Sequence, residues 1–567
     1  MSSSPIVPPP APPSTPPTGS AEPDDRIVGL RPSGWLLIAA FALVLGLMIR
    51  TIPLTSGEAR MLQQWPTEDG YLMLTIARNI AIGNGMTVAE GSIPTNGTQP
   101  LMTFLYAAGF AVTGGDKSAG VLVALVMQLI IAAAGFVLLH HLIARVVRPH
   151  RLAPAAATVG ASLWFLGPLI TSHSMNCLET GLSMLLIMTA ALAWLRLLEV
   201  RETEPGLHAG RAAVLGVALG LATLARIDAA LLVTAVTGVH FLAGALQRPA
   251  RTRPAFLESC IAGAIAVTIT APWLIANQVR FGSIMPISGT AQQASGSFAS
   301  NLAGLPAVLT EHIVLAGGIP SSMQTSTLVQ IGGAAVALVF FGLTALLAFR
   351  SRSSSRILVA GSLLAVLIYA GYYGLTFGAP HFLSRYMLPV AILAAGVTGL
   401  MGAWILQILH ARGPAGRGAI AALLLIGVGA IGFQHLRIHR NAMPHMHWQV
   451  VEWIDGNVPD ETWVGAIQTG TLGFFHDRTI NLDGKVNPEA LEARLERRIP
   501  EYVAGSQIMY LADWVGIAGW TEHEPIAENF DVIVQDPERN LAVLERRAIA
   551  RPPSGAPPHD ATTSTLD

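Results

Sequence analysis

The chain has 567 residues, of which 52% are hydrophobic and only 12% are charged, and its mean hydropathy is +0.52. Because about a quarter of the residues of an ordinary soluble domain are charged, this composition indicates a polytopic membrane protein. The formal net charge of −1, without a dense run of lysine or arginine, gives no case for binding nucleic acid. The only two cysteines, Cys177 and Cys260, fall near opposite membrane faces in the topology derived below. This excludes a cysteine-based metal site and argues against a disulfide.

The first 33 residues are predicted to be a disordered cytoplasmic segment. Residues 1–24 are rich in proline, serine and alanine and cannot bury a core. Arg26 and Arg31 precede the apolar run 34–53, which is long enough to span a membrane and has no clear small-residue cleavage site. We therefore expect an uncleaved anchor with a cytoplasmic N-terminus.

A transmembrane domain is predicted over residues 34–437, and its arginines set the topology. Arginine clusters lie between the apolar segments and mark those loops as cytoplasmic. The segment 101–113 is too short for a hydrocarbon core that needs about 20 residues, so we expect a partial or outer-leaflet helix there. About 11 spans follow, or 12 if that segment crosses. After the anchor, the predicted spans are 119–144, 153–171, 177–195, 212–226, 229–247, 256–276, 327–349, 357–376, 387–410 and 418–435.

Residues 438–550 change in character and are predicted to form a small extracytoplasmic α/β domain, because an odd number of spans leaves the C-terminal part outside. Residues 551–567 are a polar, proline-bearing tail that we expect to be disordered. Periodicity within the domain predicts helices over 444–457 and 488–504, strands over 462–467 and 507–511, and a hairpin of 531–535 with 541–545.

The loop 55–100 after the first span is the polar centre of this apolar chain, and loops of this length are more often functional than connecting. It contains the adjacent acids Glu68 and Asp69. Interfacial acids are functional candidates, and such a carboxylate could deprotonate an acceptor hydroxyl or hold a divalent cation. The alternative is helix capping, since Thr67 and the two acids suit a helix that starts near Gly70.

Charged residues interrupt the apolar segments elsewhere on the predicted outer side. Glu179 opens a span, and its alternative role is that of a helix N-terminal acid. Arg226 and Asp228 separate two spans, and their alternative role is a structural ion pair that offsets the cost of burying each charge.

Three further basic residues are predicted at the outer interface: Arg280, His381 and Arg385. They could bind an anionic lipid headgroup, because the arginine guanidinium matches phosphate geometry in a bidentate way. The alternative for both arginines is snorkelling from a helix end.

The remaining polar patterns have simpler interpretations. Residues 96–98 (Asn-Gly-Thr) fit a glycan acceptor pattern but are expected to be turn chemistry. Residues 481–484 (Asn-Leu-Asp-Gly) predict a strand followed by a tight turn, or a sugar contact. Four histidines lack a metal-binding spacing and are expected to be interfacial or solvated: His435, His439, His445 and His447.

Taken in order, these motifs resemble the GT-C superfamily of integral-membrane glycosyltransferases that use polyprenyl-phosphate-linked sugars. Within it, the chain resembles the terminal arabinofuranosyltransferases of the mycobacterial cell wall, over about residues 35–545. The chain departs from the family motifs at Glu68, Ile227 and Ile287, where the family has Asp, Pro and often Asn. The matching motifs are D-D-A-Y (Glu68–Tyr71), G-x-G (Gly83–Gly85), S-P-L (Gln99–Leu101), G-M-E-T-A (Cys177–Gly181), R-P-D/E (Arg226–Asp228), Y-G-x-x-x-P-N (Phe281–Ile287), R-Y-x-x-P (Arg385–Pro389) and V-N-L-D-G-L-V-N (Ile480–Asn487).

The resemblance implies a GT-C fold of about 11–12 transmembrane helices in the plasma membrane with a small extracytoplasmic α/β domain. It implies Asp69, with Glu68 beside it, as the catalytic base for an acceptor hydroxyl. It leaves a divalent cation (Mg, Mn or Ca) open and assigns no metal ligands. The implied substrate-binding residues are Tyr71, Asn96, Gln99, Glu179, Asp228 and Asp483, and the implied donor-phosphate ligands are Arg226, Arg280, His381 and Arg385.

The implied reaction transfers a sugar to an envelope glycan or glycolipid, with inversion and with polyprenyl phosphate as leaving group. An anionic leaving group needs fixed positive charge more than a proton. A flippase or transporter for lipid-linked saccharide is an alternative, but the polar residues gather on one side of the predicted membrane. A non-catalytic assembly subunit is disfavoured by the Glu68/Asp69 pair, and a polymerase of lipid-linked repeats stays open.

Overall fold

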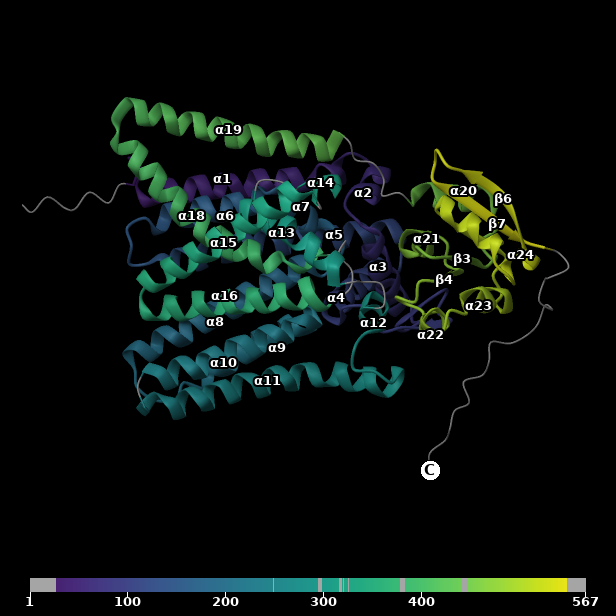
Figure 1. Ribbon diagram of the computed structural model, residues 1–567, viewed down its shortest axis with the longest axis horizontal. Helices are drawn as coiled ribbons and strands as arrows, with labels where there is room; N and C mark the ends of the chain where they lie inside the picture. Colours follow the sequence, from purple (N-terminus) through teal and green to yellow (C-terminus); the bar gives the residue numbers. More distant parts are fainter. Residues whose placement is uncertain are drawn as a thin grey trace, which may run out of the picture.

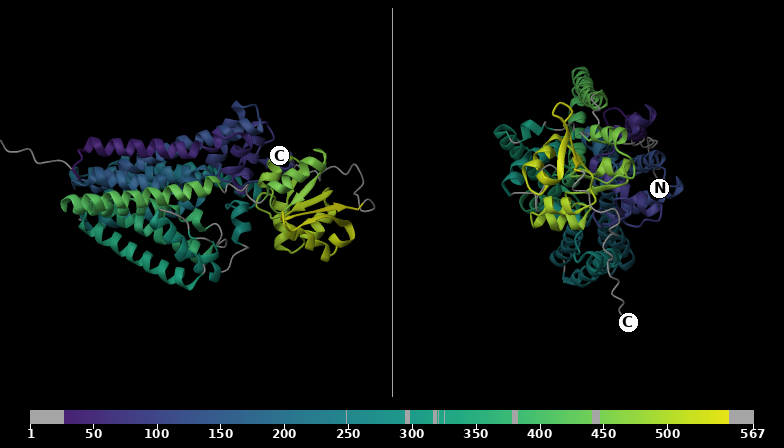
Figure 2. Two further views of the ribbon diagram at one scale, coloured as in Figure 1. Left: turned by 90° about the horizontal axis from the view of Figure 1, so that it is seen from above. Right: turned by 90° about the vertical axis from the view of Figure 1, so that its right-hand side faces the viewer.

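The computed structural model describes residues 27–247, 249–293, 298–315, 319, 321–324, 326–377, 383–440 and 447–547. Most of the two predicted disordered ends therefore lies outside the described residues. Long helices lie side by side to form an elongated bundle, and a small α/β domain caps one end of it (Figures 1 and 2).

The bundle confirms the predicted polytopic helical architecture. Within the described ranges, nine helices are long and apolar enough to span a membrane, or ten if one bent pair counts as a span. The nine are α1 (Pro32–Thr51), α5 (Lys117–Val147), α8 (Thr180–Thr203), α10 with the turn before it (Ile227–Gln247), α11 (Pro249–Phe281), α15 (Thr327–Arg350), α16 with its extension (Ser353–Leu375), α18 (Leu388–Ala411) and α19 (Gly413–Arg440).

One predicted span differs from the continuous helix that we expected. The span 153–171 is divided into α6 (Ala153–Leu166) and α7 (Pro168–Met175), which are bent by 61°. The break lies before Pro168, because a proline pushes the preceding residue out of helical conformation. The predicted span 212–226 is one continuous helix, α9 (Ala209–Ala225), of 17 residues.

Short elements gather near the capped end of the bundle. One of them, α4 (Pro100–Val112), is a helix of 13 residues, in agreement with the short helix predicted there. The others are α2 (Glu58–Gln64), α3 (Glu68–Ala81), α12 (Ile287–Gln293), α13 (Phe298–Val314), α14 (Ser321–Gln324), α17 (Leu383–Tyr386) and the two-stranded β1 (Thr87–Val88) and β2 (Ile93–Pro94).

The C-terminal domain contains a five-stranded mixed sheet in the order β4-β3-β5-β7-β6. β3 is parallel to β4 and β5, whereas β7 is antiparallel to β5 and β6. The predicted strand 462–467 and the hairpin are confirmed, whereas the strand predicted over 507–511 begins only at Tyr510 and continues to Asp513. The bounds are β3 (Val464–Ala466), β4 (Thr479–Asn481), β5 (Tyr510–Asp513), β6 (Phe530–Asp536) and β7 (Leu541–Arg546).

The helices of this domain agree only in part with the prediction. α20 (Trp448–Asn457) confirms the described part of the predicted helix 444–457. The predicted helix 488–504 is two helices, α22 (Pro488–Leu495) and α23 (Ile499–Gly505). Arg497 between them has φ +59°, a left-handed conformation that ends an α-helix.

An aromatic cluster fastens the C-terminal domain to the bundle. Helix α21 (Gly470–Phe475) packs on α3, and the ring of Tyr71 lies 5.0 Å from that of Phe474 and 6.2 Å from that of Trp448. Buried aromatic pairs of this kind contribute about 0.5–1.5 kcal/mol each beyond their buried area. The contact holds the domain over the N-terminus of α3, where Glu68 and Asp69 lie.

Candidate active site

A cavity of about 580 Å³ lies between the bundle and the C-terminal domain. One side of its wall is apolar and is formed mainly by residues of α10 and α11, including Leu231, Val267 and Leu274. The other side is polar. It is formed by Asp69, Gln99, Glu179, Arg226, Asp228, Gln292, Tyr373, Arg385, Tyr386 and Lys485.

Asp69 is placed by the first turn of α3. The helix begins at Glu68, and the hydroxyl of Thr67 accepts a hydrogen bond from the backbone N–H of Gly70 at 3.1 Å. The capping alternative is thus confirmed for Thr67, and it leaves the Asp69 side chain available to face the cavity. A carboxylate in the first turn of a helix is favoured by the helix dipole.

Two cations flank the carboxylate of Asp69. Arg385 Nη1 lies 3.1 Å from Asp69 Oδ2, and Lys485 Nζ lies 3.8 Å from Asp69 Oδ1 and 3.2 Å from Asp483 Oδ2. Burial lowers the pKa of Lys485, but the carboxylates of Asp69 and Asp483 outweigh burial and raise it above its ordinary value. The ammonium group therefore stays charged beside Asp69.

A tight turn after β4 holds Lys485 in this position. Asn481 Oδ1 accepts the Gly484 N–H at 2.9 Å, and Asp483 Oδ1 accepts the Lys485 N–H at 2.8 Å. The predicted strand followed by a tight turn is thus confirmed. Gly97 lies against the same segment, and a Cβ there would come within 2.1 Å of the Lys485 carbonyl oxygen. Only glycine therefore permits the loop 55–100 to approach this closely.

Arg226, also on the polar side of the cavity, is engaged by two acids. Its guanidinium lies 3.3 Å from Glu179 Oε1 and 2.5 Å from Asp228 Oδ2, and the hydroxyl of Tyr373 donates to Asp228 as well. The ion-pair alternative is confirmed for Arg226 and Asp228. Arg226 with Glu179 and Asp228 carries a formal net charge of −1, whereas Arg385 and Lys485 with Asp69 and Asp483 are formally neutral, so a phosphate meets less opposing negative charge beside Arg385 and Lys485.

Gln99 and Asn96 fix the loops that frame the cavity. Gln99 Oε1 accepts the Ile227 N–H at 3.2 Å, and Asn96 Oδ1 accepts the Ile287 N–H at 3.0 Å. Asn96 is only 1% exposed, so the segment 96–98 is a buried turn, as expected, and its amide is inaccessible to glycan attachment.

Glu68 faces the C-terminal domain instead of the cavity. Its carboxylate accepts hydrogen bonds from the N–H of Gly470, from the N–H of Thr471 at 3.0 Å and from the Thr471 hydroxyl at 2.6 Å. The carboxylate thus caps the start of α21 from across the interface. This contact assigns Glu68 a docking role next to Asp69.

Glu68→Ala is expected to loosen the C-terminal domain, because hydrogen bonds to a charged group contribute about 1.5–3 kcal/mol each. The measurement is limited proteolysis of the purified protein, with faster release of the domain from the variant. Glu58→Ala is the matched control, since Glu58 is an exposed acid of α2. Equal cleavage rates for Glu68→Ala and wild type would contradict the docking role.

Besides Glu68, five predicted site residues are not among the described residues that line the cavity: Asn96 and Asp483, whose contacts are given above, and Tyr71, Arg280 and His381. Tyr71 is fully buried and donates its hydroxyl to the Leu62 carbonyl at 2.7 Å, so it packs the domain contact instead of binding substrate there. Arg280 is exposed at the end of α11 and does not line the cavity. His381 lies outside the described residues.

The described histidines contact neighbouring groups and are not simply solvated, and the interfacial position that we expect for them stays a prediction. His435 is buried and contacts the Leu166 carbonyl, His439 contacts Gln64, and His447 lies 3.3 Å from Asp513. His445 lies outside the described residues. Within the described ranges, no three or more His, Cys, Asp or Glu side chains gather where they could hold a metal.

The stability of the C-terminal domain is expected to decrease as pH rises through the folded-state pKa of His447. Burial lowers the pKa of His447, but Asp513 and the charge of Glu68 raise it above the ordinary 6.5. A raised pKa means that protonated His447 stabilises the folded state. This stabilisation is complete at pH values below the unfolded-state pKa and is lost as the pH rises through the folded-state pKa. Thermal unfolding from pH 5 to 9 should show this loss, and His447→Gln should flatten it. An unchanged pH profile in His447→Gln would contradict the assignment.

Sequence reasoning missed Lys485, Tyr373 and Tyr386. The rings of Tyr373 and Tyr386 stack at 4.1 Å beside the guanidinium of Arg226, which lies 5.0 Å from the Tyr386 ring. One feature of the sequence could have drawn attention to Lys485. The chain has only two lysines, and its other basic residues are arginine or histidine.

A divalent cation fits the described residues poorly. The two carboxylates that could share one, Asp69 and Asp483, already flank Lys485 Nζ. An ion with oxygen ligands would have to displace this ammonium group. The cation that the sequence left open therefore stays a prediction, and no chemical step below depends on it.

Solved structures of other proteins share this fold. ArnT from Cupriavidus metallidurans bound to undecaprenyl phosphate is similar with a TM-score of 0.57 and 13% identity, over 92% of this chain and 99% of that one. The archaeal oligosaccharyltransferase AglB from Archaeoglobus fulgidus, in complex with an inhibitory peptide and a dolichol-phosphate, is similar with a TM-score of 0.54 and 13% identity, over 92% and 75%. The predicted GT-C fold is confirmed by these similarities.

Sequence comparison is less informative. Residues 425–553 match a family model described as a domain of unknown function, DUF8728. No curated protein matches the sequence.

Proposed function

We propose that this chain is a membrane glycosyltransferase that moves a sugar from a polyprenyl-phosphate donor to a hydroxyl group of an envelope glycan or glycolipid. The observation that carries the proposal is the placement of Asp69 between Arg385 and Lys485 at the polar side of an otherwise apolar cavity. A polyprenyl-phosphate sugar has the same division into a hydrocarbon chain and a polar, anionic head.

The chemistry follows from the charges. Asp69 accepts the proton of the acceptor hydroxyl, whose oxygen then attacks the anomeric carbon of the donor. The bond from that carbon to the phosphate oxygen breaks, and polyprenyl phosphate leaves with the electron pair. A single displacement of this kind inverts the configuration at the anomeric carbon.

The leaving phosphate gains one negative charge in this step, as a phosphodiester becomes a monoester. Arg385 and Lys485 lie on the Asp69 side of the cavity and would neutralise that charge where it develops. Fixed positive groups aimed at developing charge are among the strongest catalytic contributions. We therefore assign the donor phosphate to Arg385 and Lys485, in place of the Arg226, Arg280 and His381 proposed from sequence.

The remaining polar lining residues are assigned to the sugar. Glu179, Asp228 and Gln99 line the same polar side of the cavity as Asp69 and present carboxylate and amide oxygens. Sugar hydroxyls are hydrogen-bond donors that such oxygens accept. The arabinofuranosyl specificity suggested by the sequence motifs is part of this proposal. Comparing transfer from different polyprenyl-phosphate sugars tests it.

The proposed orientation puts the cavity and the C-terminal domain outside the plasma membrane. It is supported by the arginine-rich connections at the other end of the bundle, such as Arg148 after α5 and Arg350 and Arg352 at the turn from α15 to α16. Positively charged loops of this kind favour the cytoplasmic side. The undecaprenyl phosphate bound to ArnT and the dolichol-phosphate in complex with AglB also support a lipid-phosphate ligand.

The test is transfer from a panel of radiolabelled polyprenyl-phosphate sugars by the purified chain in proteoliposomes with an envelope-glycan acceptor. Labelled product with release of polyprenyl phosphate in equal amount is the expected result. Movement of labelled lipid between leaflets without transfer would replace the proposal with the flippase alternative. Transfer only from oligosaccharide-bearing lipid would favour the polymerase.

A further inference from the structure

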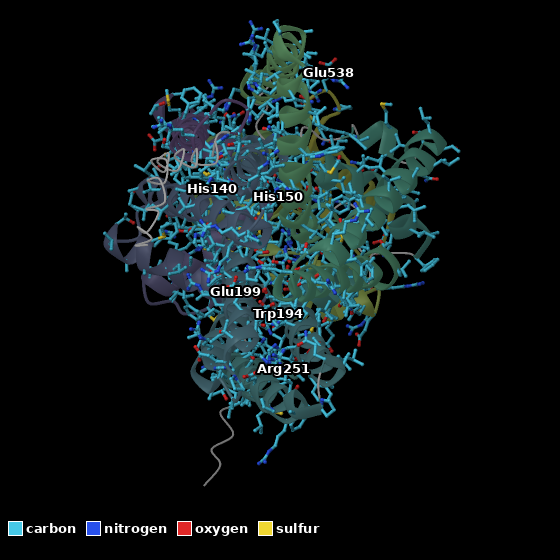
Figure 3. All side chains as sticks on the ribbon, turned by 90° about the vertical axis from the view of Figure 1, so that its left-hand side faces the viewer. His140, His150, Trp194, Glu199, Arg251 and Glu538 are labelled. Carbon is cyan, nitrogen blue, oxygen red and sulfur yellow. The ribbon has the colours of Figure 1, made fainter. Side chains whose placement is uncertain are left out.

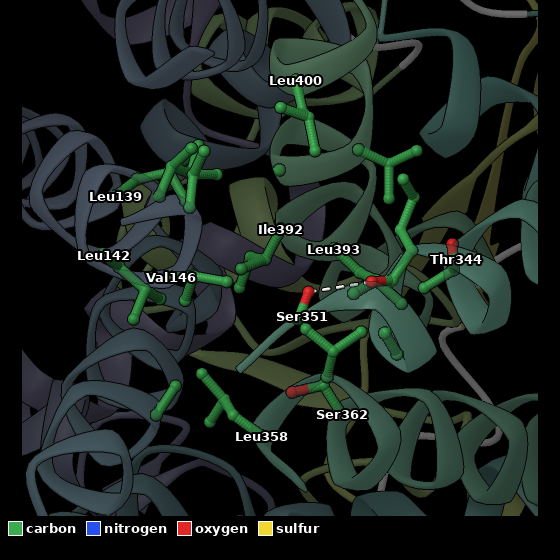
Figure 4. A pocket seen from close by; sticks show the side chains of 18 of the residues that line it. Leu139, Leu142, Val146, Thr344, Ser351, Leu358, Ser362, Ile392, Leu393 and Leu400 are labelled. Carbon is green, nitrogen blue, oxygen red and sulfur yellow. Dashed lines mark hydrogen bonds between the residues drawn. The ribbon is translucent and has the colours of Figure 1, made fainter. Parts of the chain in front are cut away.

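A second cavity of about 800 Å³ lies inside the bundle (Figure 4), and Asp69 is not among the residues that line it. It is enclosed by residues of α5, α8, α15, α16 and α18. Most of the wall is aliphatic, as the labelled Leu139, Leu142, Leu358, Ile392 and Leu400 in Figure 4 illustrate. A hydrocarbon chain would find apolar contact along this wall.

One end of this cavity is basic. Arg148 and His150 contribute from the end of α5, and Arg350 and Arg352 contribute from the turn between α15 and α16. The described residues that line the cavity include no aspartate or glutamate. This basic end lies at the face of the bundle remote from the C-terminal domain, where Figure 3 shows His150 near the middle of the view.

The arginines at this end differ in their partners. Arg352 donates to Glu199, and the same carboxylate lies 2.6 Å from Arg145. Within the described ranges, Arg148 and Arg350 form no ion pair with any carboxylate. Glu199 is thus a single negative charge shared by two arginines, and the charges of Arg148 and Arg350 are not matched by it. Surplus positive charge therefore remains at the basic end of the apolar cavity.

We propose that this cavity binds an anionic glycerophospholipid of the adjacent leaflet. Its phosphate lies against Arg148 and Arg350, and its acyl chains lie between α5, α16 and α18. Basic pockets between transmembrane helices bind acidic lipid headgroups, and the arginine guanidinium suits phosphate. The donor polyprenyl phosphate is a poorer occupant, because its phosphate has to reach Asp69 at the opposite end of the bundle. In the orientation proposed above, the leaflet is the cytoplasmic one.

The test is native mass spectrometry of the purified full chain with phosphatidylglycerol and, separately, phosphatidylcholine of the same chain length. Wild type should retain phosphatidylglycerol preferentially. The double variant Arg148→Gln/Arg350→Gln should bind phosphatidylglycerol about 30-fold more weakly, from the contribution of each basic residue near a lipid surface. The matched control is Arg196→Gln/Arg211→Gln, two exposed arginines outside the cavity, which should bind like wild type.

A second variant tests the apolar part of the site independently. Gly396 lines the cavity, and a Cβ at this position would meet no atom within 4 Å. Gly396→Phe should therefore fill the cavity and lower retention of both lipids, with an unchanged unfolding temperature. Wild-type retention of phosphatidylglycerol by both the arginine double variant and Gly396→Phe would overturn the proposal. Displacement of the bound lipid by equimolar polyprenyl phosphate would also overturn it and assign the cavity to the donor.

Discussion

Asp69→Asn is expected to lower the rate of glycosyl transfer by about 10²–10⁴-fold, the usual contribution of a positioned general base. The amide keeps the size of the side chain and can still accept hydrogen bonds from Arg385 and Lys485, but it cannot take a proton from the acceptor. Donor binding should persist, because the cations that flank position 69 remain. The measurement is single-turnover transfer beside equilibrium binding of the donor.

The control for this variant is Asp455→Asn, which removes an exposed acid of α20 far from the cavity lining. It should transfer at the wild-type rate. A further check is the pH profile of the wild type, whose acidic limb reports protonation of the base. Transfer by Asp69→Asn within tenfold of wild type would mean that another group removes the proton.

Lys485→Met and Arg385→Gln are each expected to lower transfer by about 10²–10³-fold, the cost of removing one group that stabilises developing charge. Unlike Asp69→Asn, both variants should also bind polyprenyl phosphate more weakly. Lys485→Arg should recover part of the activity, since it restores the positive charge. The measurement is donor binding and single-turnover transfer for each variant.

Lys117→Met is the matched control, because Lys117 is the only other lysine and pairs with Asp477 at 3.1 Å, outside the cavity. Its transfer rate should stay close to that of wild type. If Lys485→Met bound and transferred normally, the positive charge beside Asp69 would have only a structural role, and the donor phosphate would have to bind elsewhere.

The sequence was most informative where a property is local. The N-terminus of α3, with its Thr67 cap and Asp69 in the first turn, follows from neighbouring residues, and so does the turn that ends at Gly484. The break before Pro168 was also local, yet we predicted one continuous span across it. We predicted that span from its apolar composition alone and did not consider that Pro168 forces Gly167 out of the helical conformation.

The partners of the site could not be predicted in the same way. Arg385 and Asp69 are 316 residues apart, and Glu68 meets Thr471 across 403 residues. No periodicity reports on such contacts, because they depend on how the C-terminal domain docks on the bundle. For this reason the residues alone gave Glu68 and Asp69 the same candidate role, and only the family resemblance favoured Asp69, although one acid faces the domain and the other faces the cavity.

The most direct test is a cryo-electron microscopy structure of Asp69→Asn in a lipid nanodisc with a bound polyprenyl-phosphate sugar. We expect the phosphate between Arg385 and Lys485, the anomeric carbon facing position 69 and the hydrocarbon chain along the apolar wall of α10 and α11. A phosphate bound instead at Arg280, or at the remote end beside Arg148 and Arg350, would contradict the proposed active site.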